Sequence, residues 1–146
     1  MRRRPVDPNA VLITGSNGFS GRHLTTTIRA AAPQMRLVGL DRLRADDADT
    51  DEQVVVDLLD IAAARRVLAE VRPGTIIHLA GRTPPADEKD LWLGNVAATF
   101  NLLEAVRSEQ PAARVLVIGS AAEYGPPADD DGPLAESHAC KPTTAY

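Results

Sequence analysis

The sequence predicts a doubly wound α/β domain, in which helices cover both faces of a five-stranded parallel sheet with the strand order 3-2-1-4-5. Five short runs rich in β-branched residues are continuous rather than alternating in polarity, which is typical of strands buried on both faces. Segments with helical spacing lie between most of these runs and supply the crossovers that parallel strands require. Right-handed crossovers and short connections then favour this strand order.

The five expected strands are residues 10–14, 36–40, 53–57, 75–80 and 114–120. Three segments place apolar side chains on one helical face, and each ends at or near a proline or glycine. The three faces are Leu24, Ile28 and Ala31; Ile61, Ala64, Leu68 and Val71; and Val96, Phe100, Leu103 and Val106. Residues 41–52 show no such face and are expected to form a loop.

Length and composition indicate one globular domain. The chain has 146 residues, of which 44% are hydrophobic and 25% charged, values that are ordinary for a globular protein with a core. No apolar run approaches the roughly 20 residues that span a bilayer, so we expect a cytoplasmic protein without a membrane partner. A net charge of -4 without a basic stripe argues against a nucleic-acid partner.

No metal site is expected either. The only cysteine is Cys140, and the histidines lack metal-like spacing. The acidic runs at 46–49 and 129–131 lie among turn residues, where solvated loop charge is the common case. His78 lies inside an apolar strand and is expected to be a hydrogen-bonded core residue.

The stretch "TGSNGFSG" at residues 14–21 places Gly15, Gly18 and Gly21 directly after a strand and at the start of a helix. Glycines there allow a tight turn and let backbone amides approach a pyrophosphate, which the helix N-terminus favours electrostatically. Asp41, at the end of the second strand, can accept hydrogen bonds from a ribose and would repel a 2'-phosphate. The pattern predicts a dinucleotide site that prefers NAD, although Arg42 beside Asp41 leaves NADP possible. The alternative is that the glycines serve only helix packing and Asp41 only a loop.

The switch point of this topology falls between the first and fourth strands. Ligands of open α/β sheets bind at the carboxyl ends of the strands on either side of such a point. The loops at residues 14–21 and 78–85 are therefore expected to face one crevice.

Several motifs in order resemble the extended short-chain dehydrogenase/reductases, the group of sugar-nucleotide epimerases, dehydratases and reductases. They are the glycine loop, the pair at 57–58, "HLAG" at 78–81, "NVAATFNLLEA" at 95–105, "IGSAAEYG" at 118–125 and the final "KPTTAY". The resemblance implies that residues 1–146 form the NAD(P)-binding Rossmann-like domain, without the carboxyl-terminal substrate domain. The implied cofactor-binding residues are Gly15, Asn17, Gly18, Phe19, Ser20, Gly21, Asp41, Arg42, Asp57, Leu58, Leu79, Ala80, Gly81 and Asn95. From the residues alone, Asn95 could equally cap its helix.

The resemblance places Ser120 and Tyr146 at the catalytic serine and tyrosine positions. A tyrosine with a pKa of ~10 needs a nearby cation to act as a base at neutral pH, and the family supplies a lysine four residues later. Position 150 lies beyond this sequence, so a shortened chain is expected. Whether this chain is active by itself is left open. A non-catalytic dinucleotide-binding or interaction module is the alternative.

The resemblance also implies a nucleotide-sugar substrate in the full-length enzyme, with a homodimer possible. The segment around Ser120 is similar to 4-keto reductases and 4-epimerases, which the available residues do not separate. A 4,6-dehydratase would carry a glutamate at Ala122. Glu123 stands one place later, and on an extended segment it would point to the opposite face, so dehydration is disfavoured.

Overall fold

The computed structural model describes residues 6–126 and 133–146, and these contain a five-stranded parallel sheet. The strands are β1 (Asp7–Thr14), β2 (Arg36–Asp41), β3 (Glu52–Val55), β4 (Pro73–His78) and β5 (Arg114–Val117). Their spatial order is β3-β2-β1-β4-β5, and every neighbouring pair is parallel. The predicted doubly wound topology with the order 3-2-1-4-5 is confirmed.

The strands differ from the predicted ranges mainly at their ends. The first begins three residues earlier, at Asp7, and the fourth runs from Pro73 to His78 rather than from 75 to 80. The fifth ends at Val117, three residues before Ser120. The residues that follow the carboxyl ends of β4 and β5 are still apolar. The apolar pattern therefore predicts that these two strands end later than they do.

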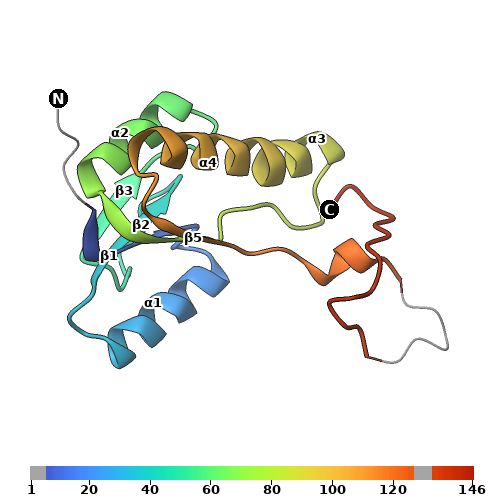
Figure 1. Cartoon of the computed structure of the whole chain (residues 1–146), viewed down its shortest axis with the longest axis horizontal. Helices are drawn as coiled ribbons and strands as arrows, with labels where there is room; N and C mark the ends of the chain where they lie inside the picture. Colours follow the sequence, from blue (N-terminus) through green and yellow to red (C-terminus); the bar gives the residue numbers. More distant parts are fainter. Residues whose placement is uncertain (1–5, 127–132) are drawn as a thin grey trace.

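Helices cover both faces of the sheet. The helix α1 (Phe19–Ala31) packs on one face, while α2 (Ile61–Val71) and α4 (Ala98–Glu109) lie together on the other (Figure 1). A short helix, α3 (Glu88–Leu91), and a π-helical turn, η1 (Trp92–Ala97), lead into α4, and a 3-10 turn, η2 (Ala121–Tyr124), follows β5. Figure 1 also shows that the chain after β5 runs to one side of the sheet.

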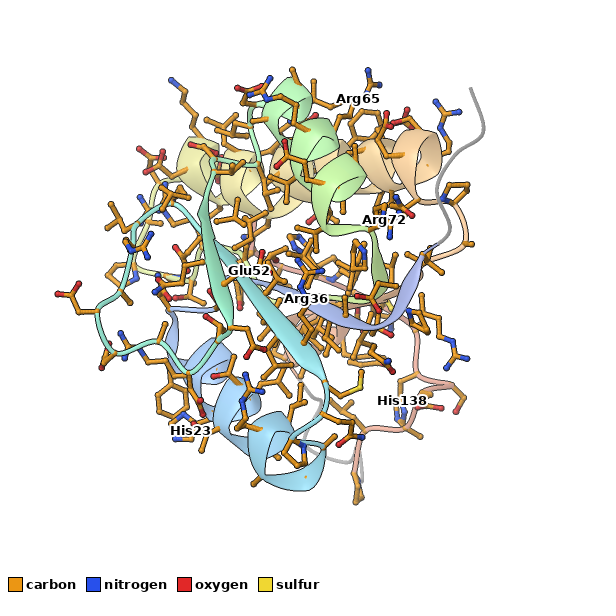
Figure 2. The ribbon with its side chains drawn as sticks, turned by 90° about the vertical axis from the view of Figure 1, so that its left-hand side faces the viewer. His23, Arg36, Glu52, Arg65, Arg72 and His138 are labelled. Atoms are coloured by element: carbon orange, nitrogen blue, oxygen red, sulfur yellow. The ribbon has the colours of Figure 1, made fainter. Side chains whose placement is uncertain are left out.

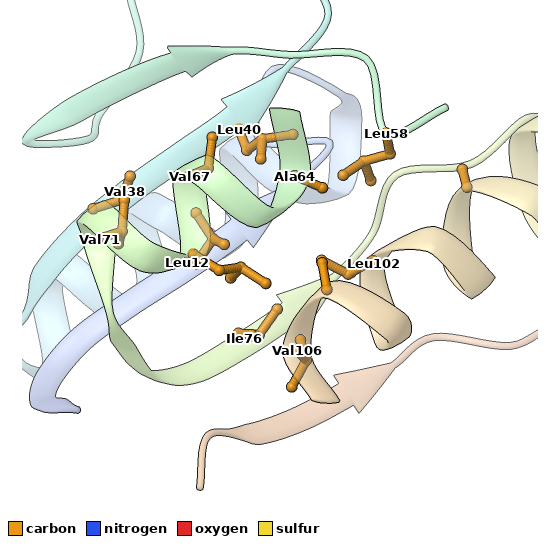
Figure 3. Packing of buried hydrophobic residues seen from close by; sticks show 13 residues of the cluster. Leu12, Val38, Leu40, Leu58, Ala64, Val67, Val71, Ile76, Leu102 and Val106 are labelled. Atoms are coloured by element: carbon orange, nitrogen blue, oxygen red, sulfur yellow. The ribbon is translucent and has the colours of Figure 1, made fainter. Parts of the chain in front are cut away.

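The main core lies between the sheet and the pair α2 and α4. Leu12 at the centre of the sheet pairs with Val38 of β2 and Ile76 of β4, and all three are fully buried. Figure 3 shows side chains of α2, such as Val67, and of α4, such as Leu102, meeting these strands. Burial of aliphatic side chains of this size contributes roughly 1.5–3 kcal/mol each. This core fixes the carboxyl ends of β1, β2 and β4 relative to one another.

The predicted face of the third helical segment is wrong in three of its four residues. Val96, Phe100 and Leu103 are exposed, and the buried face consists of Ala98, Leu102, Ala105 and Val106. Two alanines let α4 pack closely on α2. The π-helical turn has wider spacing than an α-helix, so it shifts the phase of the apolar pattern before α4 begins. Ala31 of α1 is also exposed, contrary to the prediction, whereas Leu24 and Ile28 pack on the sheet.

An apolar stripe therefore lies on the surface of η1 and α4. It consists of Trp92, Val96, Phe100 and Leu103, whose exposed fractions lie between 41% and 62%. Their spacing of four, four and three residues places them on one side of the helical segment. We call these four residues the outer stripe.

Ion pairs connect the edge strand to the rest of the sheet. Arg36 of β2 donates from Nε and Nη2 to Oε1 of Glu52 on β3, at 2.9 and 2.7 Å (Figure 2). Arg29 of α1 donates to Asp51 at 2.9 Å, and Asp51 also accepts from the backbone amide of Leu37. The start of β3 is thereby fixed to β2 and α1. Among the described residues, no helix is long and apolar enough to cross a membrane.

Candidate functional site

The turn after β1 and the first turn of α1 each require a glycine. Gly15 has a φ of +69°, and a Cβ atom on it would lie 2.8 Å from the backbone nitrogen of Ala80. A Cβ on Gly21 would lie 2.3 Å from the carbonyl oxygen of Gly15. These close approaches bring the start of α1 against the turn, and the turn against the chain after β4. The loops after β1 and β4 are thus in direct contact at the switch point.

The N-terminus of α1 is left without a capping side chain. Gly18 is its N-cap residue and has no side chain to offer to the amides of the first turn. By contrast, Asp60 caps α2 by accepting from the amide of Ala63 at 2.9 Å, and Asp87 caps α3 through Asp90. Free amides at the positive end of a helix dipole favour an anion such as a phosphate. The first turn of α1 fits the pyrophosphate of a dinucleotide.

Asp41 ties the end of β2 to the glycine loop. Its Oδ2 accepts from the backbone amide of Asn17 at 3.1 Å, and its Oδ1 accepts from the amide of Arg42 at 2.7 Å. The side chain of Asn17 then donates to the carbonyl oxygen of Leu43 at 2.6 Å. A carboxylate oxygen can accept more than one hydrogen bond, so both oxygens of Asp41 retain capacity for ribose hydroxyls. The loop after β2 is fixed before any ligand binds.

A cavity of about 880 Å³ opens at the carboxyl ends of β1, β2 and β4, a volume within the range of roughly 300–1,000 Å³ that is usual for ligand pockets. Its wall contains ten of the predicted cofactor residues: Gly15, Asn17, Gly18, Asp41, Arg42, Asp57, Leu58, Leu79, Ala80 and Gly81. The loops after β1 and β4 both contribute to it. The crevice expected at the switch point is therefore present.

Four predicted residues lie outside this wall. Phe19 is 81% exposed, and its ring contacts that of His23 at a tilt of 41°, with 4.4 Å between the ring centroids. Ser20 is exposed as well, and Gly21 is buried against the turn. Asn95 neither lines the cavity nor caps a helix. Its Oδ1 accepts from the amide of Arg82, and its Nδ2 donates to the carbonyl oxygen of the same residue. Asn95 thus shapes the loop after β4.

A chain of hydrogen bonds runs through His78 at the end of β4. Thr99 donates from Oγ1 to the carbonyl oxygen of Asn95, so His78 Nε2 donates to Thr99 Oγ1 over 2.9 Å. His78 Nδ1 then accepts from Thr14 Oγ1 at 2.6 Å, and Thr14 Oγ1 accepts from the amide of Ala80. His78 is 3% exposed, and burial lowers its pKa from 6.5 to about 4. The prediction of a hydrogen-bonded core histidine is confirmed, and the lowered pKa keeps it neutral at pH 7.

Residues 43–47 of the loop between β2 and β3 were not predicted as site residues, yet they form one wall of the cavity. Leu43, Arg44, Ala45, Asp46 and Asp47 all line it. The side chain of Gln53 accepts from the amide of Ala45 at 2.9 Å and donates to its carbonyl oxygen at 2.7 Å. The sequence signal for this wall is weak, since an irregular loop has no periodicity.

A second connection to this loop comes from α1. Arg22 lines the cavity, and its Nη1 donates to Oδ2 of Asp47 at 2.6 Å. The hydrogen bond and the charge of Arg22 lower the pKa of Asp47. Asp47 and Asp49 pair with Arg22 and Arg29, respectively. The acidic run at 46–49 thus holds the loop between β2 and β3 in place through ion pairs. The acidic run at 129–131 lies outside the described residues.

The predicted catalytic residues lie beyond the cavity wall. Ser120 is the N-cap of η2, where its Oγ accepts from the amide of Ala122 at 3.2 Å. Tyr146 is 37% exposed. The segment before Tyr146 returns to η2, because a Cβ on Gly125 would lie 2.2 Å from the carbonyl oxygen of Lys141.

The extended segment assumed around Glu123 is wrong. Residues 121–124 form a 3-10 turn, so a shift of one residue rotates a side chain by about 120° rather than to the opposite face. The argument that Glu123 must point to the opposite face therefore does not hold. The resemblance to dehydratases still lacks its glutamate, because Ala122 occupies that position.

Comparison with known proteins identifies the family. The family model "NAD dependent epimerase/dehydratase family" matches residues 11–146. The chain belongs to this family.

Its relatives catalyse different reactions. A 3-diazoavenalumate denitrifying reductase from Streptomyces sp. is 33% identical over 135 residues, which cover 85% of this chain and 43% of the relative. A dTDP-glucose 4,6-dehydratase from Neisseria meningitidis is 32% identical, with 67% of this chain and 31% of the relative covered. The chain therefore spans less than half the length of either relative.

A solved structure supports the fold of this epimerase/dehydratase family member. The UDP-glucose 4-epimerase of Brucella ovis, in complex with NAD, superposes with a TM-score of 0.84 at 28% sequence identity. The match covers 94% of this chain and 43% of that protein.

Proposed function

We propose that this chain is the cofactor-binding portion of an NAD(P)-dependent 4-keto reductase or 4-epimerase that acts on nucleotide sugars. The observation that carries the proposal is the cavity at the switch point, where the glycine turn, Asp41 and the loop after β4 meet. Its parts match those of a dinucleotide: amides at the N-terminus of α1 for the pyrophosphate and a carboxylate for the ribose. The family and the NAD complex of the Brucella enzyme support the assignment.

Different residues of the cavity wall are proposed to bind different parts of the dinucleotide. Asp41 would accept from the hydroxyls of the adenosine ribose, and Asp57 with Leu58 would flank the adenine. Leu58 is 4% exposed and is held by the core, so it offers a rigid apolar surface. Leu79, Ala80 and Gly81 would line the path from the pyrophosphate toward the nicotinamide. When bound, the nicotinamide gives a hydride to a sugar carbon or takes one from it.

Ser120 and Tyr146 are proposed to hold and move the proton in this reaction. A phenol needs a neighbouring cation to reach the phenolate at neutral pH, so the activity of the whole protein depends on the surroundings of Tyr146. The form of the segment at 118–125 favours a reductase or an epimerase, both of which need only a serine, a tyrosine with its cation, and the cofactor.

Titration of the chain with NADH by calorimetry tests the cofactor site. We expect one site per chain and a loss of affinity of about tenfold in Asp41→Asn, because charge-assisted hydrogen bonds contribute about 1.5–3 kcal/mol. Glu104→Gln on α4 is the control, since it also removes one carboxylate but lies outside the cavity wall. Absence of binding at millimolar NADH, or equal losses in both variants, would count against the proposal.

The outer stripe supports a second proposal, that two copies of the chain associate through η1 and α4. Four large apolar side chains on one helical face are unusual on a monomer and mark an interaction surface. Two such helices can pack against each other about a two-fold axis. We expect light scattering to report twice the mass of one chain, and Phe100→Glu to shift it to a monomer. A monomeric wild-type chain at high concentration would rule out this interface.

A further inference from the structure

Arg22 occupies a distinctive position at the wall of the cavity. It lies in the first turn of α1, and its Nε donates to the carbonyl oxygen of Asn17 at 3.0 Å. Its Nη1 donates to Asp47 at 2.6 Å. One guanidinium thus connects the glycine loop to the loop between β2 and β3, and all three residues line the cavity. Arg22 remains 43% exposed, so its other donors are accessible.

The surrounding charges lie at the end of the cavity nearest β2. The carboxylates there are Asp41, Asp46, Asp47 and Asp57, and the guanidinium groups are Arg22, Arg42 and Arg44. Among the described residues, only one ion pair joins these seven side chains, that between Arg22 and Asp47. Because the hydrogen bond from Arg22 and its charge lower the pKa of Asp47, this carboxylate stays ionised at neutral pH. It neutralises a cation that would otherwise face the cavity.

We propose that Asp47 determines the preference for NAD over NADP by holding Arg22 and placing a negative charge beside the adenosine ribose. The inference rests on the proposed function, since it takes Asp41 as the residue that meets that ribose. NADP differs from NAD by a phosphate on the 2'-hydroxyl, which carries close to two negative charges at neutral pH. A phosphate in this position meets Asp41 and Asp47 as repulsive neighbours, and Arg22 is already paired.

Removal of the carboxylate at position 47 changes both the negative charge beside the ribose and the pairing of Arg22. Asp47→Asn eliminates one negative charge at this end and leaves an amide that holds the guanidinium only weakly. The hydrogen bond to the carbonyl oxygen of Asn17 remains, so Arg22 stays at the wall with its other donors directed to a ligand. Arginine binds phosphate in a bidentate manner, and this interaction is stronger than that with a neutral amide. The variant therefore gains affinity for NADPH more than for NADH.

The expected change is modest because the ion pair is exposed. Measured interactions between exposed ion pairs are small, so we expect the ratio of NADPH to NADH affinity to rise about fivefold in Asp47→Asn. Asp46→Asn is the matched control. It removes the same charge from the neighbouring position of the same wall, but Asp46 has no ion pair with an arginine among the described residues.

The experiment measures Kd for NADH and NADPH by nucleotide fluorescence in four chains: wild type, Asp47→Asn, Asp46→Asn and the double variant Arg22→Ala/Asp47→Asn. Thermal unfolding of each chain confirms that it is folded. We expect a fivefold rise in the ratio for Asp47→Asn, a rise of less than about twofold for Asp46→Asn, and a return to the wild-type ratio in the double variant.

Three results would overturn the inference. They are an unchanged ratio in Asp47→Asn, an equal rise in Asp46→Asn, which would mean that net charge alone acts, and a rise that persists without Arg22. Each of these leaves the proposed function intact, because NADH still binds the wild-type chain. Binding of neither nucleotide by the wild-type chain would instead overturn the proposed function, and this inference with it.

Discussion

Replacement of Gly15 by alanine is expected to lower the free energy of unfolding by about 2–4 kcal/mol and to abolish the binding of NADH. Alanine is strained at a φ of +69°, and its Cβ would lie 2.8–2.9 Å from three backbone atoms of Leu79 and Ala80. These backbone atoms lie just after the end of β4, as Gly15 lies just after the end of β1, and they cannot give way as the end of a flexible side chain can. The turn after β1 and the chain after β4 must then separate, which distorts the cavity wall.

Gly119→Ala provides the control for this substitution. Nothing lies within 4 Å of a Cβ built on Gly119, so the free energy of unfolding should change by no more than about 0.5 kcal/mol. Urea unfolding of both variants, followed by circular dichroism, measures the difference. Equal stability of Gly15→Ala and the wild-type chain would contradict the contact between the two loops.

The second large effect is a dependence of stability on pH that comes from His78. Its pKa is lowered from 6.5 to about 4 by burial. Between these two values the unfolded chain binds a proton at this residue and the folded chain does not, so stability rises with pH. The stabilisation is complete above pH ~6.5 and is lost as the pH falls toward 4. The loss over this window is about 3 kcal/mol, at about 1.36 kcal/mol per unit of pKa shift.

His78→Asn isolates this contribution, because an amide retains hydrogen-bonding groups but does not titrate in this range. The variant should be less stable than the wild-type chain at pH 7.5, and the gap should close as the pH is lowered to 4.5. His23→Asn, on the exposed side of α1, should keep the wild-type dependence. Urea unfolding at four pH values in this interval is the measurement. Parallel pH profiles for the wild-type chain and His78→Asn would show that His78 does not control the acid response.

The topology could be predicted from the sequence because strands buried on both faces are continuous apolar runs. The run at 10–14 is apolar throughout, and in the sheet Leu12 and Ile13 point to opposite faces, each of which is covered by helices. The glycine turn was equally clear, since Gly15 and Gly21 occupy positions that no other residue could take. These constraints are local, and a single sequence displays them.

The face of α4 was not predictable in the same way. Both Leu102 and Leu103 are apolar, and periodicity alone favoured the pattern that includes Leu103 with Phe100. The structure buries Leu102 because Ala98 and Ala105 on its side allow close packing with α2. The choice between two apolar faces depends on shape complementarity with a distant helix, which a spacing pattern does not contain.

Side-chain contacts between loops could not be predicted from the sequence either. Asn17 was predicted as a cofactor residue, but its role as a connection to Leu43 was not, nor was the pairing of Arg22 with Asp47. These partners are 25 or 26 residues apart, and apart from Arg22 in α1 they lie in segments without regular structure. Their proximity follows from the crossover that sets β2 beside β1, so it becomes visible only in three dimensions.

We propose that the cavity between the loops after β1 and β4 binds an adenine dinucleotide. Titration of the isotope-labelled chain with NAD, followed by amide chemical shifts, measures this binding residue by residue. We expect saturable shifts at Gly15, Gly18 and Asp41 on one side of the cavity and at Ala80 and Gly81 on the other. Saturable shifts confined to other surfaces, or none at millimolar NAD, would contradict it.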